Sequence, residues 1–442
     1  MNNNNQTSSF KNNLIRARSH IIFILALITA FALVISLDKA SFENRVVSKA
    51  NVEKVTNLQV SATRELTKEE MQWAKIAWRY FENNTIEETG LANSANAYPS
   101  TTLWDSSSYL LGVISARRLA IIDETEFTKR VNKFLLSMQN LPLYEGKLPN
   151  KAYNTMTLEM VDYNNQAIDK GLGWSALDIG RFMVPLNILV WNYPQFTPQV
   201  KAITKKWSLD SAVKKGEMYG ALNENNETLY LQEGRLGYEE YAAKSFQLIG
   251  LDVSSAIDYT AWLEFVNIEG INVPTDTRTP EKFTAYNYVV SEPYILDGLE
   301  YGWDQLSQEF AGRVFKAQEA HYERTGKLTA VSEDNIDQAP YFVYNTVFTD
   351  GKKWNAITED GTDASEFKTL STKAAFGWHM LYETEYTKKL MKAVSGLNDP
   401  EKGWYSGLYD KTGKPNKALT ANTNGIILES LAYKQTGQLL KP

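Results

Sequence analysis

A succession of segments with the 3.6-residue period of amphipathic helices constrains the fold of this chain more than any other feature. Polar loops separate these segments, and several begin on a helix-capping residue such as Thr102 or Ser175. Strand patterns are few and short, at 228–231 and 341–348. Twelve helices are predicted, over 68–84, 102–121, 125–139, 174–192, 197–211, 235–250, 255–267, 291–301, 304–324, 363–381, 384–397 and 420–436.

Short links join these helices in pairs, and longer aromatic loops separate some of the pairs. Six helical hairpins closed in a ring make an (α/α)6 toroid, and this all-α fold with a few short strands is the predicted architecture. Its inner helices would be buried on both sides, and their starts would converge on a central cleft. An open helical solenoid is the alternative, but no repeat of 34 or 40 residues is present.

An uncharged apolar run of 17 residues, 21–37, precedes the helical region. Lys11, Arg16 and Arg18 lie before it and no acidic residue does, which predicts a cytoplasmic N-terminus and a single-pass transmembrane anchor. A cleaved signal peptide is the rival interpretation. The length of the run and the poor cleavage site favour the anchor.

The predicted organisation therefore has four parts. A disordered cytoplasmic tail occupies 1–20, the transmembrane anchor 21–37, a polar stalk 38–65 and the toroid domain 66–442.

Composition narrows the possible chemistry. The chain has no cysteine and only three histidines, so neither a metal site nor a cofactor is expected. The formal charge of −6 argues against nucleic acid as a partner. No P-loop, dinucleotide fingerprint or nucleophile elbow occurs. The 11 Trp, 24 Tyr and 18 Phe are typical of a sugar-binding protein or of a large aromatic core.

Aromatic residues and acids recur where loops enter helices, at Trp104–Asp105, Trp174–Asp178, Arg235–Glu239 and in the stretch 403–434. Aromatic rings stack on the apolar face of a pyranose, and neighbouring polar groups bind its hydroxyls. The candidates for substrate binding are Trp104, Trp174, Arg181, Arg235, Tyr238, Trp404, Tyr405, Asn422 and Asn424.

Glycoside hydrolysis generally needs two carboxyl groups, one of them protonated. Eight acids are candidates: Asp105, Asp178, Glu233, Glu239, Glu240, Glu292, Glu333 and Asp334. Glu239 and Asp178 are the leading catalytic pair, and Glu292 and Asp105 are next. The competing interpretations are structural, because Asp105 and Asp178 also suit helix N-termini.

Seven segments, from "YPSTTLWDSSSYLLGVISA" to "GWYSGLYDKTGKPNKALTANTNGIILESLAYK", resemble the bacterial domain-of-unknown-function family 3131 over about residues 65–437. That family is distantly similar to (α/α)6 glucan-active proteins, such as glycoamylase-like domains and β-1,2-glucanases. With the predicted anchor at 21–37, we expect a protein of the bacterial inner membrane whose C-terminal domain faces the periplasm.

The predicted function is a glycoside hydrolase or transglycosylase that acts on an envelope or exported polysaccharide. A non-catalytic glycan-binding or scaffold subunit of a polysaccharide-export system is the alternative, with export proteins as possible partners. A polysaccharide lyase that uses a tyrosine base is a third interpretation.

Overall fold

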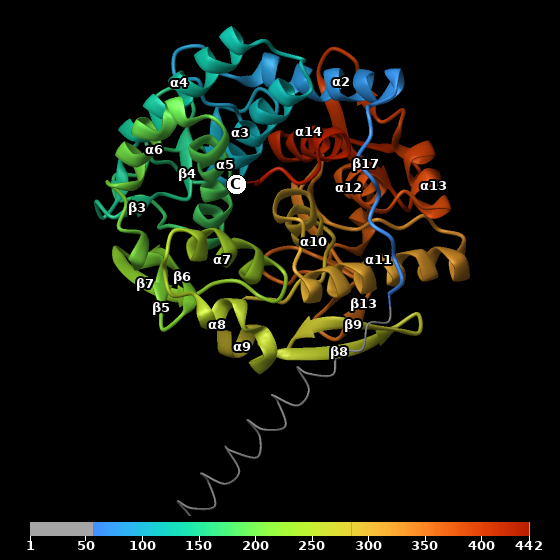
Figure 1. Ribbon diagram of the computed structural model, residues 1–442. Coiled ribbons are helices and arrows are strands. Elements are labelled where there is room, and N and C mark those ends of the chain that lie inside the picture. The colour runs from blue at the N-terminus through green and yellow to red at the C-terminus, as the bar shows by residue number, and fades with distance from the viewer. Residues whose placement is uncertain (1–55, 284, 442) are drawn as a thin grey trace, which may run out of the picture. The chain divides into compact units, whose positions relative to one another are not determined.

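The computed structural model describes residues 56–283 and 285–441. Six of its helices form an inner ring, in which each helix contacts the next and the last contacts the first (Figure 1). These inner helices are α3 (Leu103–Arg118), α5 (Ala176–Asn192), α7 (Tyr238–Leu248), α10 (Glu292–Leu296), α12 (Thr372–Tyr382) and α14 (Ala421–Thr436).

The outer helices alternate with the inner ones along the chain. They are α2 (Lys68–Asn84), α4 (Glu124–Asn140), α6 (Thr197–Thr204), α8 (Ser254–Ile257), α11 (Gln305–Thr325) and α13 (Glu385–Val394). Each packs on the inner helix before it, and α2 packs on α14 and so closes the ring. This alternation is the one predicted from the sequence, although α8 has only four residues.

The prediction of a helix at 255–267 is wrong. Most of that segment forms α8 and strand β8 (Leu263–Ile268), which pairs with β9 (Ile271–Asp276) in an antiparallel hairpin. Glu269 and Gly270 form the two-residue turn, and both have positive φ angles of 51° and 83°. Two positive φ angles define the turn type that matches strand twist, so local turn geometry overrides the helical period here. The hairpin packs on α11 where a full outer helix would lie.

The extent of burial distinguishes the inner helices from the outer helices. Every residue of α12 is buried, whereas α13 buries one face only. A helix that is enclosed all round has packed neighbours on every side, as an inner helix of a ring does. The close approach of α5 and α7 depends on small residues. A Cβ added at Gly180 of α5 would lie 2.7 Å from Cβ of Ala242 in α7.

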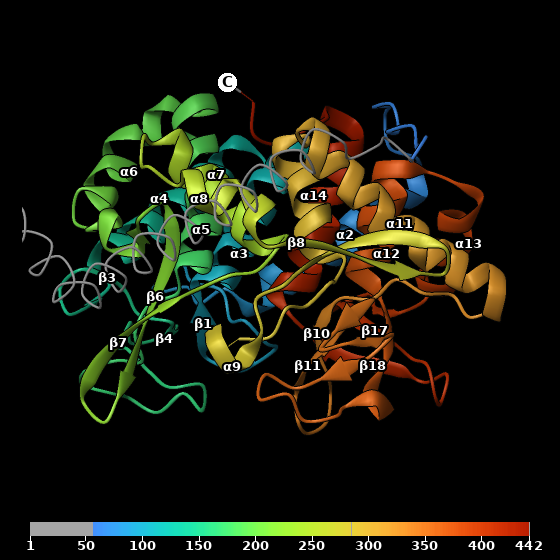
Figure 2. The ribbon, with the colours of Figure 1, turned by 90° about the horizontal axis from the view of Figure 1, so that it is seen from below.

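Apart from the β8–β9 hairpin, most of the strands gather beside the starts of the inner helices (Figure 2). Three of them lead directly into inner helices: β1 (Ser100–Thr102), β15 (Thr369–Ser371) and β18 (Pro415–Leu419). The longer strands in this region are β6 (Glu217–Glu224), β7 (Glu227–Gln232) and β17 (Gly403–Tyr409). The shorter ones include β4 (Ala152–Asn154), β10 (Glu333–Asn335), β11 (Phe342–Asn345), β13 (Lys352–Lys353) and β14 (Ala356–Ile357).

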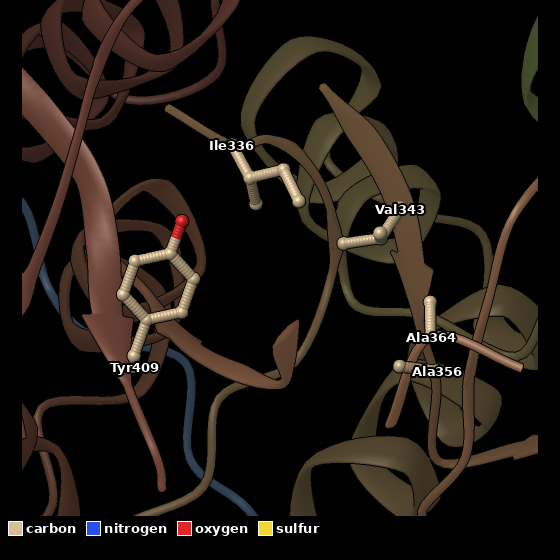
Figure 3. Close-up of a cluster of buried hydrophobic side chains, with 5 residues drawn as sticks. All are labelled: Ile336, Val343, Ala356, Ala364 and Tyr409. Carbon is tan, nitrogen blue, oxygen red and sulfur yellow. The ribbon is translucent and has the colours of Figure 1, made fainter. Parts of the chain in front are cut away.

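The segment 403–409, which the sequence analysis places in an aromatic substrate loop, is strand β17, paired with β15 and β18. A small hydrophobic cluster lies beside this strand and β11 (Figure 3). Its members are Ile336, Val343, Ala356, Ala364 and Tyr409. The hydroxyl of Tyr409 donates a hydrogen bond to Asp337 at 2.6 Å, so the polar end of the ring is satisfied.

The described part of the predicted stalk, 56–65, lies along the helical body. The Thr56 hydroxyl donates to Glu309 at 2.7 Å, and the backbone N–H groups of Ser61 and Arg64 donate to carbonyls at the C-terminal ends of α12 and α14. The folded unit thus begins before residue 66. Within 56–283 and 285–441 no helix has the length and apolarity to cross a membrane, and the predicted anchor at 21–37 lies outside the described residues.

Candidate active site at the starts of the inner helices

The carboxylate of Glu292, in the first turn of α10, is a meeting point of the inner ring. Trp104 of α3 donates its indole N–H to this carboxylate at 2.9 Å, and the Asn422 amide of α14 donates at 3.1 and 3.2 Å. Nζ of Lys373 in α12 lies 2.5 Å away, and a guanidinium nitrogen of Arg181 in α5 lies 3.6 Å away. One carboxylate therefore binds side chains from four other inner helices, and we call these five residues the central cluster.

Glu292 is ionised in this environment. Its side chain is completely buried, which by itself would raise its pKa. The charges of Lys373 and Arg181, together with the hydrogen bonds it accepts, outweigh burial and hold the pKa of Glu292 below its usual value. The sequence analysis predicts Glu292 as a catalytic acid. It is ionised, fully buried and bonded to four neighbours, and these contacts join the helix starts.

Arg181 connects the central cluster to a second pair of acids deeper in the ring. Its guanidinium donates to Glu429 at 3.4 Å, and the Tyr241 hydroxyl donates to Glu300 at 2.6 Å. Burial and mutual repulsion raise the pKa of Glu429, and burial raises that of Glu300 to about 7. Arg181 is fully buried, so its contacts are with protein carboxylates rather than with a ligand.

Asp334 of β10 also faces Lys373, with its carboxylate 3.7 Å from Nζ. Burial raises the pKa of Asp334 to about 8, although Lys373 opposes this shift. The side chains of Glu333 and Asp334, both candidate acids in the sequence analysis, are buried.

Trp104 is a member of the central cluster that reaches solvent. Its ring is partly exposed, lies under the Arg181 guanidinium at 4.6 Å and meets Tyr238 edge-on at 5.7 Å. The Tyr238 hydroxyl donates to Glu333. The structure therefore brings Trp104, Tyr238, Arg181 and Asn422 together, as expected for residues at the starts of inner helices.

Three partly exposed acids lie at the starts of α3 and α5, and we call Asp105, Asp178 and Glu233 the acid group. The Ser175 hydroxyl donates to Asp178 at 3.0 Å, and Glu233 accepts the backbone N–H of Ala176 at 2.6 Å. Burial, followed by the charge of Glu233, raises the pKa of Asp178 to about 7. Asp178 thus holds a proton at neutral pH for much of the time, and Glu233 lies at the N-terminus of α5.

The pKa of Asp105 is also raised by burial, while hydrogen bonds from Ser94 and Thr102 oppose the shift. Thr102 caps α3 by accepting the backbone N–H of Asp105 at 3.1 Å, and its hydroxyl donates to the Asp105 carboxylate at 2.8 Å. The charge of Asp105 in turn contributes to the raised pKa of Asp178. The acid group therefore contains interacting carboxyls, and burial raises the pKa of two of them, Asp105 and Asp178, as a general acid requires.

Three tyrosines that the sequence analysis does not single out lie near Glu359, and one of them, Tyr163, also lies near Asp178 and Glu233 of the acid group. Tyr163 is 61% exposed, and desolvation of its hydroxyl together with the nearby charges of Asp178 and Glu359 raises the pKa of that phenol. Tyr288 and Tyr344 stack face to face at 3.6 Å. Burial is the main cause of the raised pKa of the Tyr288 phenol, followed by the charge of Glu359. Burial also raises the pKa of the Tyr344 phenol, followed by Tyr288 and then by the charge of Glu359. Tyr163 and the stacked pair therefore share the Glu359 carboxylate as a neighbour.

Glu239, predicted as a catalytic acid, does not join the acid group. Its carboxylate is buried and lies 2.7 Å from Arg278, and the Gln232 amide donates to it at 3.0 Å. Glu239 follows Tyr238 by one residue, so the helix turns it to another side. Its partner Arg278 lies directly after the β8–β9 hairpin, of which the sequence analysis assigns only 263–267 to a helix, and the sequence analysis does not name Arg278.

Arg235, predicted to bind substrate, donates to the backbone carbonyls of Phe283 and Ala285 at 3.0 and 3.1 Å. It is buried, and it holds the segment after α9 (Pro280–Phe283) against the start of α7.

Three further residues predicted for sugar binding are buried in the protein core. Trp174 donates its indole N–H to the Tyr219 carbonyl, and Trp404 donates to the Trp73 carbonyl, each with 0% exposure. Asn424 accepts the backbone N–H of Trp404 at 2.8 Å. Tyr405 is partly buried and alternates with Trp404 along β17, so the two rings point to opposite faces.

Lys373 is the main central residue that the sequence analysis misses. The predicted helix at 363–381 places it in a helix interior, whereas α12 begins at Thr372 and Lys373 lies in the first turn. The signal was present in "LSTKAAF", since Ser371 is a favourable helix start. Among the described residues, no group of three or more His, Asp and Glu side chains is placed to hold a metal ion.

Solved structures with the same fold are glucan-related proteins. A glucoamylase-like protein from Bacteroides caccae has a TM-score of 0.61 at 12% identity and covers 84% of this chain and 94% of its own. The endo-β-1,2-glucanase of Chitinophaga pinensis, solved with sophorotriose and glucose, has a TM-score of 0.59 at 11% identity and covers 85% and 94%.

The endo-β-1,2-glucanase of Talaromyces funiculosus, solved with sophorose, has a TM-score of 0.55 at 11% identity and covers 84% and 85%. At these identities the similarity establishes the fold. No curated protein matches the sequence. The model of the family described as protein of unknown function (DUF3131) matches residues 72–437, and the chain therefore belongs to this family.

Proposed function

We propose that this protein is a glycoside hydrolase or transglycosylase that acts on a polysaccharide, with its reaction centre at the acid group. The observation that carries the proposal is the pairing of Asp178, whose pKa is raised to about 7, with the neighbouring carboxylate Glu233. Asp178 would donate its proton to the glycosidic oxygen of the leaving sugar. Glu233 would act on the anomeric carbon, either directly or by taking a proton from water.

The surroundings of the acid group support a sugar substrate. Tyr163 is exposed, and Trp104 and Tyr344 are partly exposed. Exposed ring faces next to carboxylates suit a pyranose, which has apolar faces and polar edges. The endo-β-1,2-glucanases with the same fold were solved with sophorose and sophorotriose, so β-1,2-glucan is the first substrate to test.

The predicted cellular location also remains a proposal. The apolar run 21–37, with Lys11, Arg16 and Arg18 before it, would anchor the chain in the bacterial inner membrane with residues 66–442 in the periplasm. This topology would place the enzyme on envelope or exported polysaccharide, beside export proteins. Protease added to spheroplasts would then degrade the C-terminal domain while leaving cytoplasmic proteins intact.

The decisive assay measures reducing ends released from a polysaccharide panel by the full-length chain. Asp178→Asn and Glu233→Gln should each lower the rate by about 10²-fold or more, because acid–base catalysis contributes that much. Glu385→Gln is the matched control, since Glu385 is an acid with 84% side-chain exposure at the start of an outer helix. Full activity of both site variants would refute the assignment.

A non-catalytic glycan-binding function is the second candidate. It is favoured by the burial of two predicted acids, Glu239 and Glu292, in ion pairs with cations. Retention of the wild-type chain on a polysaccharide gel without any release of reducing ends would select this alternative.

A further inference from the structure

A pocket with a volume of about 240 Å³ lies away from the central cluster. It is formed by the end of α11, by Asn345 of β11 and by residues next to β14, β15 and β17. Tyr344, the neighbour of Asn345 in the same strand, stacks on Tyr288. Because successive residues of a strand point to opposite faces, this pocket and the stacked tyrosines lie on opposite sides of β11.

One wall of the pocket is a pair of aromatic rings held by a carboxylate. The His321 and Trp354 rings lie 4.1 Å apart. Glu269, in the turn of the β8–β9 hairpin, lies 2.9 Å from Nδ1 of His321 and accepts the Trp354 indole N–H at 3.2 Å. Arg324 donates to the same carboxylate and, by this bonding, lowers the pKa of Glu269 to about 2. The fixed carboxylate therefore holds both rings in place.

Charged side chains line the opposite wall of the pocket. Lys327 is exposed and Lys368 is partly exposed, and neither forms an ion pair within 56–283 and 285–441. Asp410 lies across from them. Burial raises the pKa of Asp410 above its usual value, and the charges of Lys327, Lys368 and His321 oppose this shift. The pocket thus holds two ammonium groups and one carboxylate, which leaves an excess of positive charge.

These features differ from an ordinary surface ion pair. Arg181 and Arg235, which the sequence analysis considers for substrate binding, are buried against protein carboxylates and carbonyls. Lys327 and Lys368 are instead open to a ligand. A volume of about 240 Å³ is smaller than the roughly 300–1,000 Å³ of pockets for drug-sized ligands, and it suits a single sugar unit.

We propose that this pocket binds one acidic sugar unit, such as a uronate, of the polysaccharide on which the protein acts. The Trp354 and His321 rings would contact the sugar ring, and Lys327 and Lys368 would bind its carboxylate. This inference rests on the proposed function, and it makes a polysaccharide with acidic residues the preferred substrate class. Asp410 would accept a hydroxyl hydrogen of the same sugar.

The test is isothermal titration of the full-length chain with trigalacturonate and with maltotriose as the neutral probe. Wild type should bind trigalacturonate at least about tenfold more tightly than maltotriose, and this preference should weaken as salt concentration rises. Lys327→Gln/Lys368→Gln should remove the preference. Lys352→Gln/Lys353→Gln is the matched control, because both lysines are exposed on β13 outside the pocket.

Each outcome separates this proposal from the proposed function. Equal affinity for the two probes, or an unchanged preference in the Lys327/Lys368 variant, would overturn the acidic-sugar pocket. Asp178→Asn should keep the preference while losing hydrolysis. A preference that depends on Lys327 and Lys368, in a protein that hydrolyses nothing, would leave the pocket standing and remove the enzyme.

Discussion

The Nζ atom of Lys373 lies 2.5 Å from a carboxylate oxygen of Glu292, and both side chains are almost completely enclosed by the inner helices. This ion pair joins α12 to α10, and its acid also binds Trp104 and Asn422 from α3 and α14. An ion pair and hydrogen bonds thus hold the starts of these inner helices together.

Lys373→Met is expected to lower the free energy of unfolding by about 3–5 kcal/mol, because it leaves the Glu292 carboxylate buried with one charge partner fewer. Urea denaturation of the full-length chain measures this loss. Adding Glu292→Gln should recover part of it, since no unpaired carboxylate then remains. A double variant that loses the sum of the two single losses would contradict this explanation.

Hydrolysis is expected to decline as pH rises above about 7, because Asp178 then loses the proton that it donates to the leaving sugar. A pH–rate profile of kcat on the best substrate checks this limb. The residual activity of Asp178→Asn should lack it. Persistence of the same alkaline limb in that variant would assign the limb to another group.

Asp178 should also reduce stability at alkaline pH. Its folded pKa of about 7 lies above its ordinary value of 3.8, so the folded protein retains a proton that the unfolded chain releases. Stability is therefore lost as pH rises through this window. We expect Asp178→Asn to stabilise the protein by about 0.5–2 kcal/mol at pH 8 and by almost nothing at pH 4. Denaturation curves at the two pH values would test this, and equal effects at both would exclude the linkage.

Glu239→Gln is expected to destabilise the protein by about 3 kcal/mol without a specific effect on catalysis, because it breaks the buried pair with Arg278. Thermal unfolding and the rate per folded molecule separate the two effects. Arg278→Gln should give a similar loss of stability. A large fall in rate at unchanged stability would return Glu239 to the catalytic candidates.

Gly180→Ala should cost about 1–3 kcal/mol, because the new methyl group would lie 2.7 Å from Cβ and the carbonyl oxygen of Ala242 in the neighbouring inner helix. Gly396→Ala is the control, since nothing lies within 4 Å of a Cβ there. Urea denaturation of both variants compares them. Equal stability of the two would mean that α5 and α7 can separate at little cost.

The helical order could be predicted from the sequence because inner and outer helices each carry strong local signals. The predicted range 68–84 coincides with α2, which begins on the Thr67 cap, and α14 begins one residue after its predicted start. The hairpin at 263–276 was missed because its decisive signal is the pair of positive φ angles at Glu269 and Gly270, not a period. Arg278, the partner of Glu239, follows this hairpin and was also missed.

The sequence by itself determined which residues stand at helix starts, since Trp104, Asp178 and Asn422 each lie in the first turn of an inner helix. Capping and periodicity are local, and a single chain segment contains them. Only the tertiary structure decided which way each side chain faces: Tyr238 toward Trp104, Glu239 toward Arg278, and Trp404 into the core. Adjacent residues differ by about 100° around a helix or by opposite faces of a strand, so their roles depend on partners that are distant in sequence.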